Sequence, residues 1–176
     1  MYKYNNSTNQ HNVQFISKAT KSYCSFNKIY IKSILIPVVI GGIIGLIISN
    51  FLDYNLLEKP FLAPSGMLFP IIWTIIYILM GISYGILKNK SLTNQKIKII
   101  YYLQLFVNAM WPIIFFILKW RLFSFIWILL LDLLVIIMIH LFYNKDKLSG
   151  ILQIPYLIWI LFASYLNIAI YLLVGA

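Results

Sequence analysis

The sequence predicts an all-α membrane protein, a bundle of five transmembrane helices. Of its 176 residues, 62% are hydrophobic and only 10% are charged, and the mean hydropathy is +0.88. A soluble domain usually carries about 25% charged residues, so this chain has too little charge to cover a surface that faces water. Its apolar residues fall into separate blocks of about 20, a length that crosses a hydrocarbon core of roughly 30 Å. The bilayer is therefore the expected solvent.

The apolar blocks define the helices in order, and short polar or proline-containing segments separate them. The expected spans are 31–52, 67–87, 97–118, 122–143 and 151–173. All five are long enough to cross a membrane.

Two polar segments lie outside these spans. Residues 1–30 are rich in Asn, Ser and Lys and hold no acidic residue. They lack the apolar stretch of a secretory signal, so we expect a disordered cytoplasmic tail, with a mitochondrial presequence as the alternative. Segment 53–66 is the longest connection between helices and contains Pro60 and Pro64. We expect it to form a lid over the bundle.

Basic residues predict the orientation, because cytoplasmic loops collect lysine and arginine. Of the 14 basic residues, eleven lie on the side of the N-terminus, and the opposite side holds only Lys59, Lys119 and Arg121. We therefore expect the N-terminus in the cytoplasm and the C-terminus outside. Abundant Ile, Asn, Lys and Tyr suggest AT-rich coding, so we expect the membrane to be a bacterial inner membrane. The net charge of +10 comes from basic residues that lie between the apolar blocks, where they orient the helices. They do not form a water-exposed basic face, so we expect no nucleic-acid partner.

Motifs of soluble enzymes are absent from the sequence. It contains no glycine-rich phosphate loop and no Cys or His cluster at metal-ligand spacing. The single cysteine, Cys24, excludes an intramolecular disulfide. His11 and His140 are better explained as surface or interface residues. The sequence therefore predicts no metal site and no required cofactor.

Polar and aromatic side chains recur at helical spacing on three of the predicted spans. Steps of three or four residues place them on one face of each helix. A polar group buried in hydrocarbon needs a partner or a cavity, so these faces predict either a ligand pocket or seams where helices hydrogen-bond to one another. The three stripes are Trp73, Tyr77 and Tyr84, then Tyr101, Gln104, Asn108, Trp111 and Phe115, and finally Tyr156, Trp159, Ala163 and Asn167.

Depth favours the pocket for two of the tryptophans. At 1.5 Å per residue, Trp73 is expected about 9 Å below the outer membrane boundary and Trp159 about 12 Å above the inner one. In a core of about 30 Å, the two indoles then differ in level by roughly 9 Å, which is about the width of a large flat aromatic ligand.

Three blocks of sequence keep a distinctive order and spacing. They are 59–64 (KPFLAP) with 69–81 (FPIIWTIIYILMG), then 104–111 (QLFVNAMW) with Phe115-Phe116, and lastly Pro155-Tyr156 with Trp159, Phe162-Ala163 and Leu166-Asn167. In these blocks the chain resembles the translocator protein family, also called tryptophan-rich sensory proteins or peripheral benzodiazepine receptors. The resemblance covers the chain from about Ile31 to the C-terminus.

This resemblance implies a five-helix bundle, usually dimeric, that binds porphyrins and benzodiazepine-type ligands beneath the first loop. It also implies light-dependent breakdown of protoporphyrin that requires two pocket tryptophans, which map onto Trp73 and Trp159. By motif, Asn108 and Trp111 match pocket positions, and Ala163 matches a small residue whose enlargement affects ligand binding.

Together, the stripes and the resemblance predict a membrane protein that binds a porphyrin as ligand or substrate. The ring would stack on Trp and Tyr faces, with its propionates at a cation such as Lys59. The candidate ligand-binding residues are Lys59, Pro64, Trp73, Tyr77, Gln104, Asn108, Trp111, Phe115, Tyr156, Trp159, Ala163 and Asn167.

The chain also departs from the family pattern. Leu62, Ser65 and Met67 stand in a loop where members often carry aromatic residues or a second proline, which lowers the expected number of aromatic contacts to a ligand. No basic residue follows Tyr171, so the cholesterol-recognition pattern is incomplete and sterol transport is disfavoured.

Two other functions stay open. One is a carrier or stress sensor that binds a porphyrin without transforming it. The other is a proton-coupled transporter built around Asp132, although a helix contact is the favoured explanation for that residue.

Two small-residue patterns, Gly41 to Gly45 and Gly81 to Gly85, permit close helix approach. We expect the first to serve a dimer or an intramolecular contact, with no role in the pocket.

Overall fold

The computed structural model describes residues 28–51, 60 and 62–174, and this part of the chain folds into helices. Five segments are long and apolar enough to cross a membrane, which confirms the predicted all-α membrane protein. The helices are the N-terminal helix Lys28–Phe51, ending in the short 3-10 turn η1 (Ser49–Phe51), α2 (Leu68–Asn89), α3 (Gln95–Pro112) with its π-helical extension η2 (Ile113–Ile117), α4 (Arg121–Tyr143), α5 (Lys147–Ile151) and α6 (Ile154–Val174).

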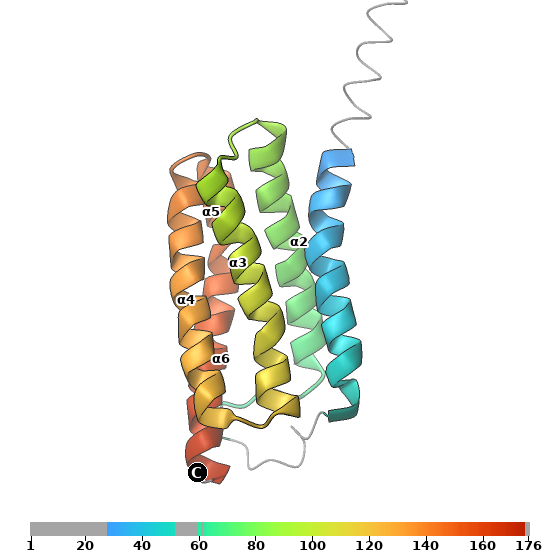
Figure 1. Cartoon of the computed structure of the whole chain (residues 1–176), viewed down its shortest axis with the longest axis vertical. Coiled ribbons are helices and arrows are strands. Elements are labelled where there is room, and N and C mark those ends of the chain that lie inside the picture. The colour runs from blue at the N-terminus through green and yellow to red at the C-terminus, as the bar shows by residue number, and fades with distance from the viewer. Residues whose placement is uncertain (1–27, 52–59, 61, 175–176) are drawn as a thin grey trace, which may run out of the picture.

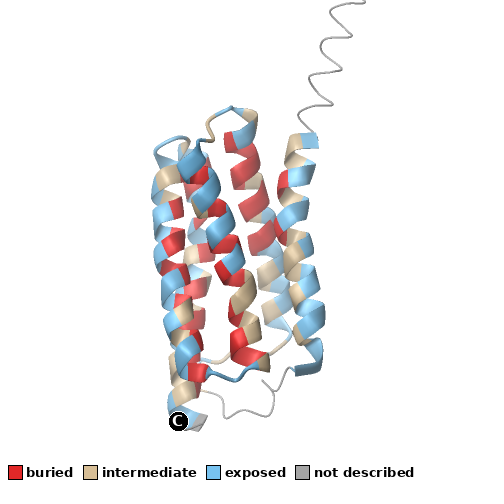
Figure 2. Ribbon diagram, in the orientation of Figure 1, coloured by how far each residue is buried: buried red, intermediate tan, exposed pale blue. Residues whose placement is uncertain are grey.

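The bundle consists of a closely packed body, helices α2 to α6, and the N-terminal helix beside it. Helix α4 packs between α3 and α6, while the N-terminal helix stands at the edge beside α2 (Figure 1). Figure 2 shows buried residues where α2, α3, α4 and α6 face one another, whereas the N-terminal helix is mostly exposed or half-buried. In the most apolar stretch of the N-terminal helix 11% of residues are buried, against 50% in α2 and in the third span. The core therefore lies among α2 to α6.

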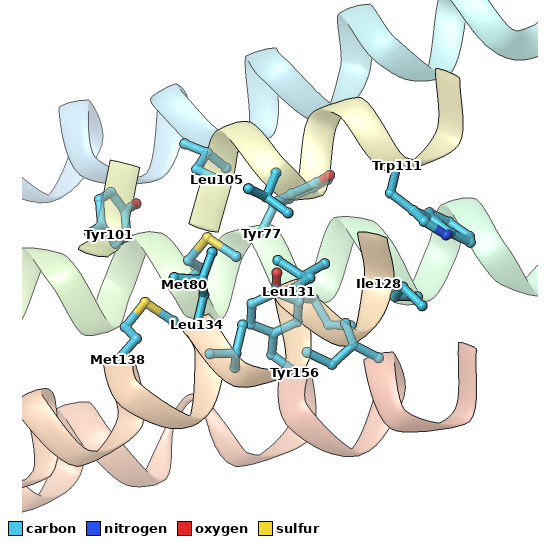
Figure 3. Packing of buried hydrophobic residues seen from close by; sticks show 14 of the residues in the cluster. Tyr77, Met80, Tyr101, Leu105, Trp111, Ile128, Leu131, Leu134, Met138 and Tyr156 are labelled. Carbon is cyan, nitrogen blue, oxygen red and sulfur yellow. The ribbon is translucent and has the colours of Figure 1, made fainter. Parts of the chain in front are cut away.

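Side chains on the two sides of these helices meet different surroundings. Inside, residues such as Met80, Leu131 and Met138 are almost fully buried in one apolar cluster (Figure 3). Outside, large apolar side chains such as Ile126 and Ile158 are more than half exposed. An apolar outer surface suits lipid, which is as apolar as the side chains themselves.

The fifth span differs from the single helix expected at 151–173. It begins at Lys147, because the Asp146 carboxylate accepts a hydrogen bond of 2.9 Å from the backbone N–H of Ser149 and so caps α5. It is interrupted after Ile151, because Pro155 has no N–H to donate to the Ile151 carbonyl. Hydropathy alone contains neither signal.

The predicted tail also needs a correction at its end. Residues 28–30, which were assigned to it, belong to the N-terminal helix. Lys28 can stand in this first turn because a long basic side chain reaches the membrane surface from a helix end. Residues 1–27 lie outside the described part of the chain, as do 53–59 and 61 of the expected lid.

Glycines bring the N-terminal helix against α2. A Cβ atom at Gly81 would lie 2.4 Å from the Ile34 Cα atom, and one at Gly85 would lie 2.9 Å from the Tyr30 ring. The pattern Gly81 to Gly85 therefore serves a contact within the chain. Gly42 is different, because a Cβ atom there would meet no other atom within 4 Å.

We expect Gly81→Ala to lower the free energy of unfolding by about 1 to 3 kcal/mol, because the added methyl group pushes two backbones apart. The matched variant Gly42→Ala adds the same methyl group to open space, so it should be neutral or more stable by up to about 1 kcal/mol. Unfolding followed by circular dichroism in detergent micelles compares the two. Equal stability of both variants would contradict the tight helix contact.

Candidate ligand cavity

A cavity of about 700 Å³ lies between the N-terminal helix, α2 and α3. It occupies the half of the bundle next to segment 62–67, and its volume is that of a typical small-molecule site. Its lining residues are Val38, Gly41, Gly42, Ile44, Gly45, Ile48, Ser65, Gly66, Met67, Phe69, Pro70, Trp73, Thr74, Tyr77, Asn108, Trp111, Pro112 and Phe116.

Two of the cavity walls are aromatic. On α2, the rings of Trp73 and Tyr77 have centroids 5.6 Å apart and are inclined by 30°. On the third span, the centroids of Trp111 and Phe116 are 6.4 Å apart at a steep angle. The third wall, on the N-terminal helix, consists of glycine and aliphatic residues. A flat ligand would thus meet rings on two sides and a smooth surface on the third.

A chain of hydrogen bonds runs from the cavity into the core. The Tyr77 hydroxyl donates to Asn108 Oδ1 (2.7 Å), and Asn108 Nδ2 donates to the Tyr156 hydroxyl (2.7 Å). The Tyr156 hydroxyl donates in turn to Gln104 Oε1 (3.0 Å), and Gln104 Nε2 contacts Met80 Sδ (3.3 Å). All five side chains are buried. This polar chain, which we call the Tyr77 to Gln104 chain, ties α2, α3 and α6 together.

A second group supports Trp111 from behind. With the Asn167 amide oriented so that donors face acceptors, its oxygen accepts from Trp111 Nε1 (2.9 Å) and its nitrogen donates to the Arg121 carbonyl (3.1 Å). The Arg121 guanidinium donates to the Phe115 carbonyl (2.9 Å) and lies 4.2 Å from the centre of the Phe115 ring. Asn167 and Phe115 therefore hold the cavity wall in place from outside the cavity.

The position of Trp159 differs from the expected one. Its ring lies beside that of Phe69 (5.7 Å between centroids), while Trp73 lies against Tyr156 (6.3 Å). Helices α2 and α6 run in opposite directions (Figure 1). Because Trp159 contacts Phe69 and Trp73 contacts Tyr156, Trp159 is about one turn nearer to segment 62–67 than Trp73, and not about 9 Å deeper as expected. The start of the fifth span at Lys147, four residues earlier than expected, accounts for about 6 Å of this difference.

The structure divides the candidate residues into two layers. Four of them line the cavity, namely Trp73, Tyr77, Asn108 and Trp111. Others form the surrounding core or touch the lining, namely Gln104, Phe115, Tyr156, Trp159, Ala163 and Asn167. Figure 3 shows Tyr77, Trp111 and Tyr156 coming from three different helices. Pro64 precedes the lining residue Ser65, and Lys59 lies outside the described residues.

We did not expect the N-terminal helix to line the cavity. Gly41 and Gly45 were expected to have no pocket role, but both line the cavity, together with Gly42. A Cβ atom at Gly41 would lie 2.1 Å from the Tyr77 ring, so this glycine also makes room for a cavity residue. The available signal was three glycines within five residues on a helix that has no polar stripe.

Asp132 of α4 lies outside the lining. It is buried, and the Ser164 hydroxyl on α6 donates to its Oδ2 atom (2.8 Å). The hydrogen bond joins two helices of the body. This geometry agrees with the favoured explanation of Asp132 as a helix contact.

Similarity to known proteins covers the same region of the chain, the five membrane spans. A model of the TspO/MBR family matches residues 33–173, which include most of all five spans. Tryptophan-rich protein TspO of Archaeoglobus fulgidus is 43% identical over 121 residues, 68% of this chain and 78% of the relative. Protein CrtK of Rhodobacter capsulatus is 34% identical over 134 residues, 74% and 84% of the two chains. Tryptophan-rich protein TspO of Bacillus cereus is 26% identical over 150 residues, 85% and 91% of the two chains.

We expect Asn108→Leu to lower the free energy of unfolding by about 1 to 3 kcal/mol, because it leaves two buried hydroxyl groups without their partner. Adding Tyr156→Phe removes one of those hydroxyls, so the double variant should lose less than the sum of the two single variants, by at least about 0.5 kcal/mol. Chemical unfolding of the four proteins in micelles gives this coupling energy. Strictly additive losses would show that the Tyr77 to Gln104 chain is not a cooperative unit.

Proposed function

The chain belongs to the TspO/MBR family, and we propose that it binds a porphyrin or a similar flat hydrophobic ligand within the membrane. The single observation that carries the proposal is the cavity of about 700 Å³ with aromatic residues on two walls. Flat π systems stack well on Trp, Tyr and Phe rings, and small-molecule sites are mostly apolar with a few polar groups that fix orientation. Tyr77 and Asn108 supply such groups at the inner end of the cavity.

A chemical role for the tryptophans is the second part of the proposal. A bound porphyrin that absorbs light can activate molecular oxygen, and an indole beside the ring can take part in the radical chemistry that opens it. Trp73 lines the cavity and would touch the ligand. Trp159 would act through Phe69, a lining residue whose ring contacts the Trp159 indole. The family resemblance supports this chemistry for both residues.

A carrier or sensor without catalysis is the alternative within the same site. Such a protein would bind the porphyrin and release it unchanged, so analysis of the products after illumination distinguishes it from an enzyme. Asp132 is bonded to Ser164 and does not line the cavity, so we do not extend the proposal to proton-coupled transport.

Binding and light chemistry can be separated with matched tryptophan variants. In the dark, protoporphyrin IX should quench the tryptophan fluorescence of the parent protein with a saturable titration. Trp73→Phe should retain binding within a few fold but slow the bleaching of the porphyrin under light by at least about tenfold. Trp120→Phe is the control, because Trp120 is 58% exposed and lies outside the cavity.

Different results remove different parts of the proposal. Bleaching by Trp73→Phe at the parent rate would remove the catalytic part and leave the carrier or sensor. Absence of saturable binding by the parent protein would remove the porphyrin-binding proposal itself.

We also propose that the N-terminus is cytoplasmic, that the membrane is a bacterial inner membrane, and that the chain forms a homodimer. The distribution of basic residues supports the orientation, and the family resemblance supports the dimer. In a variant without Cys24, Ala63→Cys should react with an impermeant thiol reagent only from outside the cell. Labelling only from the cytoplasmic side would reverse the assigned orientation.

Crosslinking in membranes tests the homodimer. A result that yields only monomers would exclude the dimer.

A further inference from the structure

Basic side chains collect at one end of the bundle, where the N-terminal helix and α3 begin (the top of Figure 1). One lysine at this end, Lys90, forms an ion pair with Asp146, the residue that caps α5. Seven further described lysines at the same end are exposed. We call them the lysine belt, and they are Lys28 and Lys32 on the N-terminal helix, Lys88 on α2, Lys96 and Lys98 on α3, and Lys145 and Lys147 beside Asp146.

The chain has no carboxylate that could balance the charge of the lysine belt. It contains only four acidic residues, and none of them lies within residues 1–52. Asp146 is already paired with Lys90, and Asp132 lies near the middle of α4. Asp53 and Glu58 follow the opposite end of the N-terminal helix in the sequence. The belt therefore attracts an anion from outside the chain.

The lysine belt borders the surface that faces lipid. Ile99 directly follows Lys98 and is 52% exposed, and Leu148 directly follows Lys147 and is 56% exposed. Tyr102, one turn beyond Lys98, is also partly exposed, and tyrosine is enriched where a bilayer meets water. A lysine stem can lie along such an apolar surface while its ammonium group reaches the headgroups. The belt thus lies at the level of the lipid phosphates.

We propose that the lysine belt binds anionic phospholipids of the adjoining leaflet. The phosphate contacts the ammonium groups, and the acyl chains pack on exposed apolar side chains such as Ile99 and Leu148. A soluble anion would contact only the ammonium groups, so the apolar border favours a lipid. This site lies apart from the ligand cavity, none of whose lining residues belongs to the belt, and it does not depend on the proposed function.

The headgroup preference is measured by native mass spectrometry of the full chain in detergent micelles. The protein is titrated with dioleoyl phosphatidylglycerol, which carries one negative charge, and with dioleoyl phosphatidylcholine, which has no net charge and the same acyl chains. In about 0.1 M ammonium acetate the anionic lipid should bind at least about tenfold more tightly, because two lysines beside one headgroup account for about that factor. Raising the salt to about 1 M should remove most of the preference, since the Debye length falls from about 10 Å to about 3 Å.

Variants at four exposed positions of the belt locate the binding. Replacing Lys96, Lys98, Lys145 and Lys147 with glutamine should reduce the preference to below about threefold. Replacing the same four residues with arginine is the matched control, and it should keep the preference of the parent because it keeps the charge. Both variants should unfold at the parent temperature when no anionic lipid is present, because the four side chains are exposed.

Each contrary result overturns a stated part of the proposal. Equal affinity of the parent protein for the two lipids would exclude selection by charge. A glutamine variant that keeps the parent preference would place the bound lipid away from the lysine belt. An arginine variant that loses as much as the glutamine variant would show that charge is not the cause. Displacement of the lipid by an equal concentration of glycerol phosphate, which has no acyl chains, would assign the belt to soluble phosphates instead.

Discussion

Inside a membrane, a polar group must find its hydrogen-bond partner within the protein, since no water is present to replace it. The Tyr77 to Gln104 chain meets this requirement for four side chains on α2, α3 and α6 at once. Each hydroxyl or amide would be left unpaired if one helix slid along another by a turn. The chain therefore fixes the register of the three helices, and the apolar cluster packs around that register.

The cavity exists because the N-terminal helix contributes no residue to the Tyr77 to Gln104 chain. This helix instead touches α2 at Gly81 and Gly85, in the half of the bundle away from segment 62–67. In the other half, Gly42 and Gly45 present no side chains, so a space remains between this helix and the aromatic walls. One end of the polar chain, at Tyr77 and Asn108, is exposed to that space. The same hydrogen bonds thus hold the bundle together and form the polar end of the cavity.

Composition and periodicity were sufficient to predict the helices and the inward stripes, because the bilayer imposes a minimum length and an α-helix repeats about every 3.6 residues. They left open whether the stripes were seams or a pocket, and the structure gives both: Asn108 bonds across helices and also lines the cavity. The expected level of Trp159 was wrong in part because the Asp146 cap, which starts the fifth span early, has no signature in hydropathy. The glycine wall was missed because a residue without a side chain carries no polar or aromatic signal. Lys59 stays a prediction.

We propose that the space beside the Tyr77 to Gln104 chain holds the ligand. An experimental structure of the complex with protoporphyrin IX in lipid would show where the porphyrin binds. We expect the flat ligand between Trp73, Trp111 and the N-terminal helix, with the hydrogen bonds of Asn108 to Tyr77 and Tyr156 unchanged. A porphyrin bound on the lipid-facing surface, or one that separates α2 from α6 and breaks those hydrogen bonds, would rule out this site.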